Sequence, residues 1–268
     1  MIIYEVNASS RCLFHCCLVF QPLPPHLPDS DEDADEQFVF HKGGPGQLDS
    51  KSKLDRECLR QAKETWDLVY SWYGTEKDWK IECGTNPIDG CVRGKKSNGG
   101  YKIFLLQAYL DINPHELWEE LVFKAPEMPK WNPTVLESRT IHPLTDTCDI
   151  SYYVAAAGAK GLVKSRDFVV VRRWGNRRGI YMSVGVSITY PGMPPVKKHV
   201  RGENGPGGVL LAPLPGESNK CEFTWYCNTN LKGMLPHKLV DTAMGGMLMD
   251  YLKYLRFRVE QINKQRGR

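Results

Sequence analysis

The chain lacks a hydrophobic run long enough to cross a membrane. A membrane helix needs about 20 consecutive apolar residues, and the longest apolar stretch near the start, residues 12–20, has about half that length. This stretch also lacks the basic beginning and the small-residue cleavage site of a secretory signal. Cys16 and Cys17 within it could be S-acylated, but an incidental apolar patch is the simpler interpretation. The sequence therefore predicts no membrane-spanning helix.

Motifs of common enzymes and metal sites are also missing. There is no GxSxG, HExxH or P-loop, and residues 205–208 do not have the spacing of a dinucleotide-binding loop. The nine cysteines form no CxxC pair, and their odd number argues against a closed disulfide framework. Cys83 and Cys91 could face each other across a hairpin, but we expect them to be reduced. The sequence thus predicts an intracellular protein without catalytic residues, metal or cofactor.

Charge is unevenly distributed. The net charge is +4, and residues 29–36 hold six carboxylates without a base, which leaves +10 for the remainder. Weak attraction to anionic membranes is compatible with this charge, although a solvated basic surface is the commoner cause, and no nucleic-acid motif is present. Residues 1–50 also contain several prolines and a glycine-rich stretch, so we expect a disordered tail. Phe38 and Phe40 could make it a docking segment for a partner, but a solvated linker is the simpler interpretation.

Residues 51–268 form one predicted domain. Helices are expected at 52–72, capped by Ser52 or Asp55, and at 113–123, capped by Asn113. Between them, residues 79–83, 91–93 and 101–108 predict a small antiparallel meander. Val- and Tyr-rich strands are expected at 151–157, 166–174, 179–187 and 221–228, with glycine-rich loops at 157–165 and 201–208.

A long helix is predicted over residues 235–263. Its apolar stripe is wide and rich in methionine: Val240, Met244, Met247, Leu248, Tyr251, Leu255, Val259 and Ile262. Gly245 and Gly246 interrupt the stripe and cost roughly 1 kcal/mol each relative to alanine, so they need a reason such as close approach of a ligand or strand, or local opening. Such a stripe is more often core than a ligand site.

Strand 166–174 places an arginine on an apolar face. Alternation puts Phe168, Val170 and Arg172 on one face, with Val169, Val171 and Arg173 on the other. Both arginines could reach water by extending their stems. Alternatively, one guanidinium could hold a ligand hydroxyl or carbonyl inside an apolar cavity.

Four motifs, in this order, resemble the START (steroidogenic acute regulatory related lipid-transfer) domain, and in particular its sterol-binding branch. They are WNPTV at 131–135, SRDF with VRR at 165–173, VRGENGPGG at 200–208 and NLKGMLP at 230–236. The resemblance covers about residues 51–265. It implies an α+β helix-grip fold, in which a curved antiparallel sheet of about nine strands surrounds a long C-terminal helix and encloses a tunnel for one lipid.

The resemblance also implies a site. Together with the stripe of the terminal helix, it predicts a lipid cavity lined by Met128, Asn132, Tyr153, Arg172, Met244, Met247, Leu248 and Tyr251. A gate is expected in the 157–165 loop and the terminal helix, at Gly161, Leu162, Gly245 and Gly246. Sterol-binding relatives carry a carboxylate nineteen residues before the cavity arginine, where this chain has Tyr153. The sequence therefore predicts that the ion pair is lost and that Tyr153, water, another acid or the ligand satisfies Arg172.

These features predict a non-enzymatic protein that binds a sterol such as cholesterol and transfers it between membranes. The alternatives are a carotenoid or another isoprenoid as ligand, an enzyme on the same helix-grip scaffold, and a ligand-sensing scaffold whose tail binds partners. We expect a monomer that makes transient contact with a membrane surface. The resemblance implies a cytoplasmic location, peripheral at late endosomes or mitochondria.

Overall fold

The computed structural model describes residues 52–75, 78–97, 101–158, 161–233 and 237–267. The predicted tail, with its acidic tract and docking segment, therefore lies outside the described residues. In chain order the elements are α1 (Lys53–Trp72), β1 (Lys80–Asn86), β2 (Gly90–Lys96), β3 (Lys102–Leu110), α2 (Pro114–Val122), the 3-10 helix η2 (Ala125–Lys130), β4 (Val135–Thr145), β5 (Cys148–Ala155), β6 (Arg166–Arg177), β7 (Ile180–Ser187), β8 (Val200–Arg201), β9 (Glu203–Asn204), β10 (Gly207–Leu214), β11 (Glu217–Cys227), β12 (Thr229–Asn230) and α3 (His237–Gln265).

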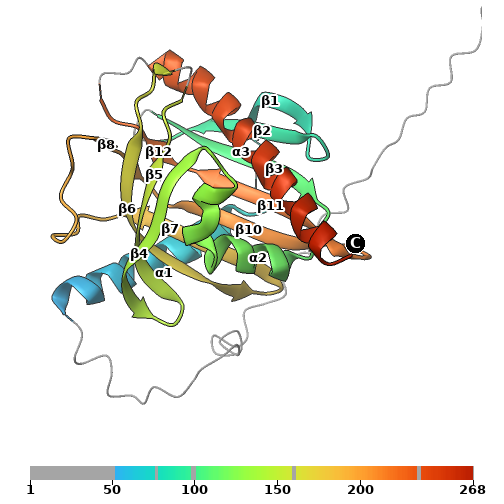
Figure 1. The fold of residues 1–268 in the computed structure, drawn as a ribbon, viewed down its shortest axis with the longest axis horizontal. Helices are drawn as coiled ribbons and strands as arrows, with labels where there is room; N and C mark the ends of the chain where they lie inside the picture. The colour runs from blue at the N-terminus through green and yellow to red at the C-terminus, as the bar shows by residue number, and fades with distance from the viewer. Residues whose placement is uncertain (1–51, 76–77, 98–100, 159–160, 234–236, 268) are drawn as a thin grey trace, which may run out of the picture. The chain divides into compact units, whose positions relative to one another are not determined.

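One large antiparallel sheet dominates the fold. Its strand order is β1-β2-β3-β11-β10-β7-β6-β5-β4, and the short β8 pairs in parallel with β6. β9 and β12 form a separate two-stranded pair. Figure 1 shows α3 crossing the sheet, with α2 and η2 beside it. This arrangement confirms the α+β helix-grip prediction and the meander β1-β2-β3.

The apolar core is divided between the two faces of the sheet. On the face covered by α2 and α3, Leu106, Phe223 and Leu252 are buried in one cluster. On the opposite face, α1 packs against the sheet through Ala62 and Val69 in two further clusters. Because side chains alternate along each strand, every central strand contributes to both faces.

Local sequence explains where the first two helices begin. Ser52 accepts a hydrogen bond from the backbone N–H of Asp55, and the Asp55 carboxylate accepts one from the Ser52 N–H, so α1 starts with a capping box. Such a cap contributes about 1 kcal/mol. The Asn113 side chain caps α2 by accepting from the His115 N–H, and Pro114 stands where no helical N–H bond is needed. Both predicted helices are confirmed.

The prediction of a glycine-rich loop at 201–208 is wrong in part. The structure forms β8, β9 and the start of β10 there. A Cβ at Gly207 would lie 2.5 Å from the Tyr226 carbonyl oxygen, and one at Gly208, whose φ is +150°, would lie 2.3 Å from the Ser183 carbonyl oxygen. These glycines therefore allow β10 to pair closely with β11 and β7, and they do not mark a loop.

Candidate functional site

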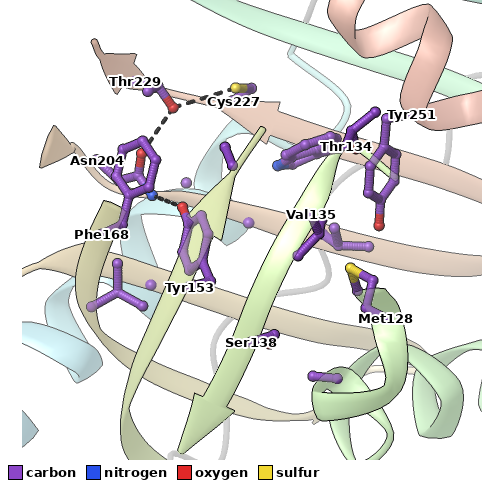
Figure 2. Close-up of a pocket in the computed structure, with 18 of the residues that line it drawn as sticks. Met128, Thr134, Val135, Ser138, Tyr153, Phe168, Asn204, Cys227, Thr229 and Tyr251 are labelled. Atoms are coloured by element: carbon purple, nitrogen blue, oxygen red, sulfur yellow. Dashed lines mark hydrogen bonds between the residues drawn. The ribbon is translucent and has the colours of Figure 1, made fainter. Parts of the chain in front are cut away.

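A cavity of about 610 Å³ lies between the inner face of the sheet and α3. Its wall is formed by β4, β5, β6, β7, β10 and β11, by the segment from α2 to η2, by Ala157, Gly158 and Gly161, and by α3 as far as Tyr254. Most lining side chains are apolar. Figure 2 shows Met128 and Tyr251 on one side of the cavity, and Phe168 and Tyr153 on the other.

The first half of α3 contributes the helical wall. Met244, Met247, Leu248 and Tyr251 follow one another at helical spacing and line the cavity, as the stripe predicts. Farther along the same stripe, Leu255, Val259 and Ile262 are buried in the core and do not line the cavity. Alternation and helical spacing alone could not reveal where the cavity ends and solid packing begins.

Polar contacts hold the second half of α3 in place. The Arg258 Nε atom lies 2.7 Å from an oxygen of Glu120 on α2, and Glu120 is only 2% exposed. The Asn263 amide donates to the Asp111 carbonyl oxygen at 2.7 Å. Because a buried pair is costly to break, this half of the helix is anchored. In the first half, Asp241 lies 3.3 Å from the Lys102 Nζ atom on β3 in a partly exposed ion pair.

Arg172 lies on the cavity wall and pairs with a carboxylate. Its Nη2 and Nε atoms donate to the two oxygens of Asp149 at 2.8 and 3.2 Å. Asp149 stands directly opposite Arg172 in the pairing of β5 with β6 and is 3% exposed. Thr140 and Ser151 each donate a further hydrogen bond to this carboxylate, at 2.8 and 2.9 Å.

The ion pair with position 153 is absent, as predicted, but Arg172 is not left without a carboxylate. The carboxylate comes from Asp149 instead of position 153, so the group that satisfies Arg172 is another acid. The predicted strand began at residue 151, whereas β5 begins at Cys148. Extending the alternation by two residues places Asp149 on the same face as Ser151 and Tyr153, so this signal could have predicted its face but not its pairing with Arg172.

The Arg172 guanidinium retains hydrogen-bonding capacity. Of its five N–H donors, the bonds found among the described residues use two for Asp149 and one for the Val122 carbonyl oxygen at 3.4 Å. Two donors remain for a ligand oxygen. The paired carboxylate also stabilises the charge of Arg172 next to an apolar cavity, because it provides a matched bidentate partner.

Tyr153 belongs to a second polar group. Its ring stacks on Phe168 with the centroids 4.8 Å apart. Its hydroxyl accepts a hydrogen bond from the Asn204 amide, whose oxygen accepts one from Thr229 at 2.8 Å. Figure 2 shows these bonds on the cavity wall. Asn204 and Thr229 were not predicted from the sequence, because Asn204 lies in the segment that looked like a loop.

The prediction that Asn132 lines the cavity is wrong. It is fully buried but is not among the residues that line the cavity. Its side-chain oxygen accepts hydrogen bonds from the backbone N–H of Thr134 at 3.0 Å and from the Thr134 hydroxyl at 2.7 Å. Asn132 therefore holds the turn that leads into β4. The other predicted lining residues, Met128, Tyr153, Arg172, Met244, Met247, Leu248 and Tyr251, all lie on the wall.

The four predicted gate residues occupy different environments. Gly161 lines the cavity and has a φ of +89°, whereas Leu162 is 65% exposed. A Cβ at Gly245 would lie 3.5 Å from the Cβ of Cys83 on β1, and one at Gly246 would meet no atom within 4 Å. The 3.5 Å distance at Gly245 is an ordinary van der Waals contact, so the approach of β1 does not require a glycine there. No neighbouring atom explains Gly246.

The 157–165 loop approaches α3 where Gly158 faces Met247. A Cβ at Gly158 would lie 2.8 Å from the Met247 sulfur, so glycine permits this contact. The Gly158 N–H donates to the Val163 carbonyl oxygen at 2.9 Å and closes the base of the loop. Residues 159 and 160 lie outside the described residues. The loop and the first half of α3 are thus neighbours at the cavity wall.

The sequence matches the START domain family over residues 59–265. The chain belongs to the START family. It is 32% identical over 217 residues to the mitochondrial steroidogenic acute regulatory protein of Mesocricetus auratus, covering 81% of this chain and 76% of that protein. The protein of the same name from Homo sapiens is 30% identical over 202 residues, covering 75% of this chain and 70% of that protein.

Solved structures agree with this START fold. Human StAR-related lipid transfer protein 5 superposes with a TM-score of 0.72 at 22% identity, covering 78% of this chain and 99% of that one. Human STARD10 superposes with a TM-score of 0.63 at 20% identity, covering 74% of this chain and 81% of that one. At these identities the likeness shows the fold. Family membership and the apolar cavity together support lipid binding and transfer as the general function.

No helix in the described ranges is both long and apolar enough to span a bilayer. The six cysteines that the described residues include, Cys58, Cys83, Cys91, Cys148, Cys221 and Cys227, are free thiols. Cys83 stands opposite Val92, and Cys91 stands opposite Gly84, so the two cysteines of the β1–β2 hairpin are neighbours out of register.

Proposed function

We propose that this START domain binds one sterol molecule in the cavity and carries it between membranes. The observation that carries the proposal is a mainly apolar cavity whose wall holds Arg172, which is paired with the buried Asp149 and keeps two N–H donors without a partner among the described residues. The volume of about 610 Å³ falls within the roughly 300–1,000 Å³ of small-molecule sites. The names of the relatives, which refer to steroidogenesis, favour a sterol over other lipids.

Burial supplies most of the binding free energy in this proposal. Each Å² of apolar ligand surface removed from water contributes roughly 25 cal/mol. Arg172 adds orientation, because a ligand oxygen placed beside its two remaining donors gains charge-assisted hydrogen bonds. Met128, Met244, Met247, Leu248 and Tyr251 surround the apolar body, and their flexible side chains can adapt to it.

The paired carboxylate also bears on the enzyme alternative. A general base needs an oxygen free to accept a proton from a substrate. Both oxygens of Asp149 are occupied, by Arg172, Thr140 and Ser151. This arrangement favours binding over acid–base catalysis. A carotenoid or another isoprenoid remains the second ligand candidate, since it has the same apolar character.

Release of the ligand requires an opening, for which we propose the 157–165 loop and the first half of α3. The exposed Leu162 would contact the membrane while Gly158 and Met247 move apart. We place the protein at the surface of an organelle membrane and would test mitochondria before late endosomes, because the relatives are named as mitochondrial. The acidic tail as a partner-docking segment and the monomeric state remain predictions.

Extraction of the bound lipid tests the proposed function. The full chain is purified from cells supplied with sterols and carotenoids, and its lipid is identified by mass spectrometry. We expect a sterol in about equimolar amount, and transfer of labelled sterol between vesicles that depends on the protein. A carotenoid in its place would select the second candidate. Recovery of no hydrophobic molecule together with turnover of a polar substrate would contradict lipid transfer.

Replacing Gly246 with alanine tests the gate. Because a Cβ there meets no atom within 4 Å, the free energy of unfolding should rise by about 1 kcal/mol and the melting temperature by roughly 2–4 °C. A stiffer helix should also slow sterol release to vesicles. Ser71→Ala, at an exposed position of α1, is the control that should leave release unchanged. Greater stability of Gly246→Ala with an unaltered release rate would remove Gly246 from the gate.

A further inference from the structure

The cavity has a second polar end. Tyr153 stands opposite Phe168 in the pairing of β5 with β6, and Asp149 stands opposite Arg172. The two positions are four residues apart on each strand, which corresponds to roughly 13 Å at about 3.3 Å per residue. Between them the wall presents Ser151 and Val170. A ligand lying along these strands would therefore meet a polar group at each end and a mainly apolar wall between.

The hydrogen bonds of the second end form a chain that leads from Cys227 to the Tyr153 hydroxyl, and each group donates to the next. Thr229 gives its only hydroxyl hydrogen to the Asn204 oxygen at 2.8 Å, so Cys227 must be the donor in the 3.5 Å contact between its sulfur and Thr229. Asn204 in turn donates from its amide nitrogen to the Tyr153 hydroxyl oxygen. The Tyr153 hydrogen is the last in this chain, and no acceptor for it is found among the described residues. It is available to the cavity.

Protonation keeps this chain of donors intact. Burial raises the pKa of Cys227 to about 11, so the thiol keeps its hydrogen at neutral pH. Burial also raises the pKa of Tyr153 above its ordinary value. The second end is therefore a neutral donor, which suits a hydroxyl or carbonyl oxygen better than a carboxylate.

We propose that Tyr153 binds a second oxygen of the ligand, at the end opposite to the one held by Arg172. The ligand class is then an elongated apolar molecule with an oxygen acceptor at both ends, in particular a sterol that also carries a hydroxyl near the end of its side chain. This inference rests on the proposed sterol-binding function and narrows it. Asn204 and Thr229 are positioning residues, since they fix the direction in which the Tyr153 hydrogen is offered.

A comparison of two ligands tests the inference. Binding of cholesterol and of a cholesterol hydroxylated near the end of its side chain is measured on the full chain by displacement of a fluorescent sterol. One neutral hydrogen bond should make the hydroxylated ligand bind about three- to tenfold more tightly. In Tyr153→Phe, the ratio of the two affinities should fall to about one. Tyr109→Phe loses the same hydroxyl from a tyrosine that does not line the cavity, and should retain the ratio.

A second variant distinguishes the hydrogen-bond chain from packing. Thr229→Val keeps the shape but removes the donor that orients Asn204, so the amide can turn and accept the Tyr153 hydrogen. Thr229→Val should also reduce the preference for the hydroxylated ligand. It therefore provides the test if Tyr153→Phe fails to fold. Equal affinity for both ligands in the unaltered protein would overturn the inference and leave sterol binding intact. Binding of neither ligand would overturn both.

Discussion

Replacing Arg172 with leucine is expected to lower sterol affinity by at least tenfold, because a charge-assisted hydrogen bond contributes about 1.5–3 kcal/mol. The same change leaves the 3% exposed Asp149 carboxylate without its cation, so the free energy of unfolding should fall by about 3 kcal/mol. Sterol displacement and denaturant unfolding measure the two effects. A sterol without its ring hydroxyl should lose little affinity, since it makes no hydrogen bond to Arg172.

A double variant separates the two effects of this substitution. Asp149→Asn with Arg172→Leu removes both charges and keeps an acceptor for Thr140 and Ser151. It should recover more than half of the lost stability, whereas sterol affinity should stay low. If Arg172→Leu binds hydroxylated sterol as tightly as the unaltered protein, Arg172 is a structural residue and does not contact the ligand.

Filling the cavity should abolish lipid binding while the fold persists. Val170 faces the cavity midway between Phe168 and Arg172, so a tryptophan at this position would occupy the space of the ligand. Displacing only about 60 Å² of ligand surface costs about 1.5 kcal/mol, which is about tenfold in affinity. Val170→Trp should therefore be purified with little or no sterol and should transfer none between vesicles.

Controls for the filling variant come from the surface and from another strand. Val196→Trp adds the same ring at a position that is 45% exposed and does not line the cavity, and it should bind normally. Ser138→Phe fills the cavity from β4 and should reproduce the loss of sterol binding. It provides the test if Val170→Trp is unstable. Normal sterol content in both filling variants would show that the ligand binds elsewhere.

Local periodicity accounts for the parts of the site that the sequence predicted. Alternation along β6 put Phe168, Val170 and Arg172 on one face, and the structure confirms all three on the cavity wall. Helical spacing likewise grouped Met244, Met247, Leu248 and Tyr251. In both cases the direction of a side chain depends on the backbone conformation of its own element, so neighbouring residues suffice.

Contacts between strands limited the sequence predictions. Asp149 reaches Arg172 because of the register between β5 and β6, and Tyr153 reaches Asn204 although 51 residues separate them. Asn132 belonged to a matching motif, yet it holds a turn. These outcomes depend on which residues the folded sheet places opposite each other, and no periodic pattern within one segment encodes that.

By itself the sequence determined the three α-helices, most of the long strands, the inward face of β6, the apolar stripe of α3 and, through four motifs, the START fold. These follow from short-range geometry, since one residue's neighbours fix its face and its hydrogen-bonding needs. Only the tertiary structure decided that Asp149 pairs with Arg172, that a second polar end exists at Tyr153, and that α3 lines a cavity with its first half and packs with its second. The physical reason is that cross-strand register and the separation of helix and sheet arise from the packing of the whole domain.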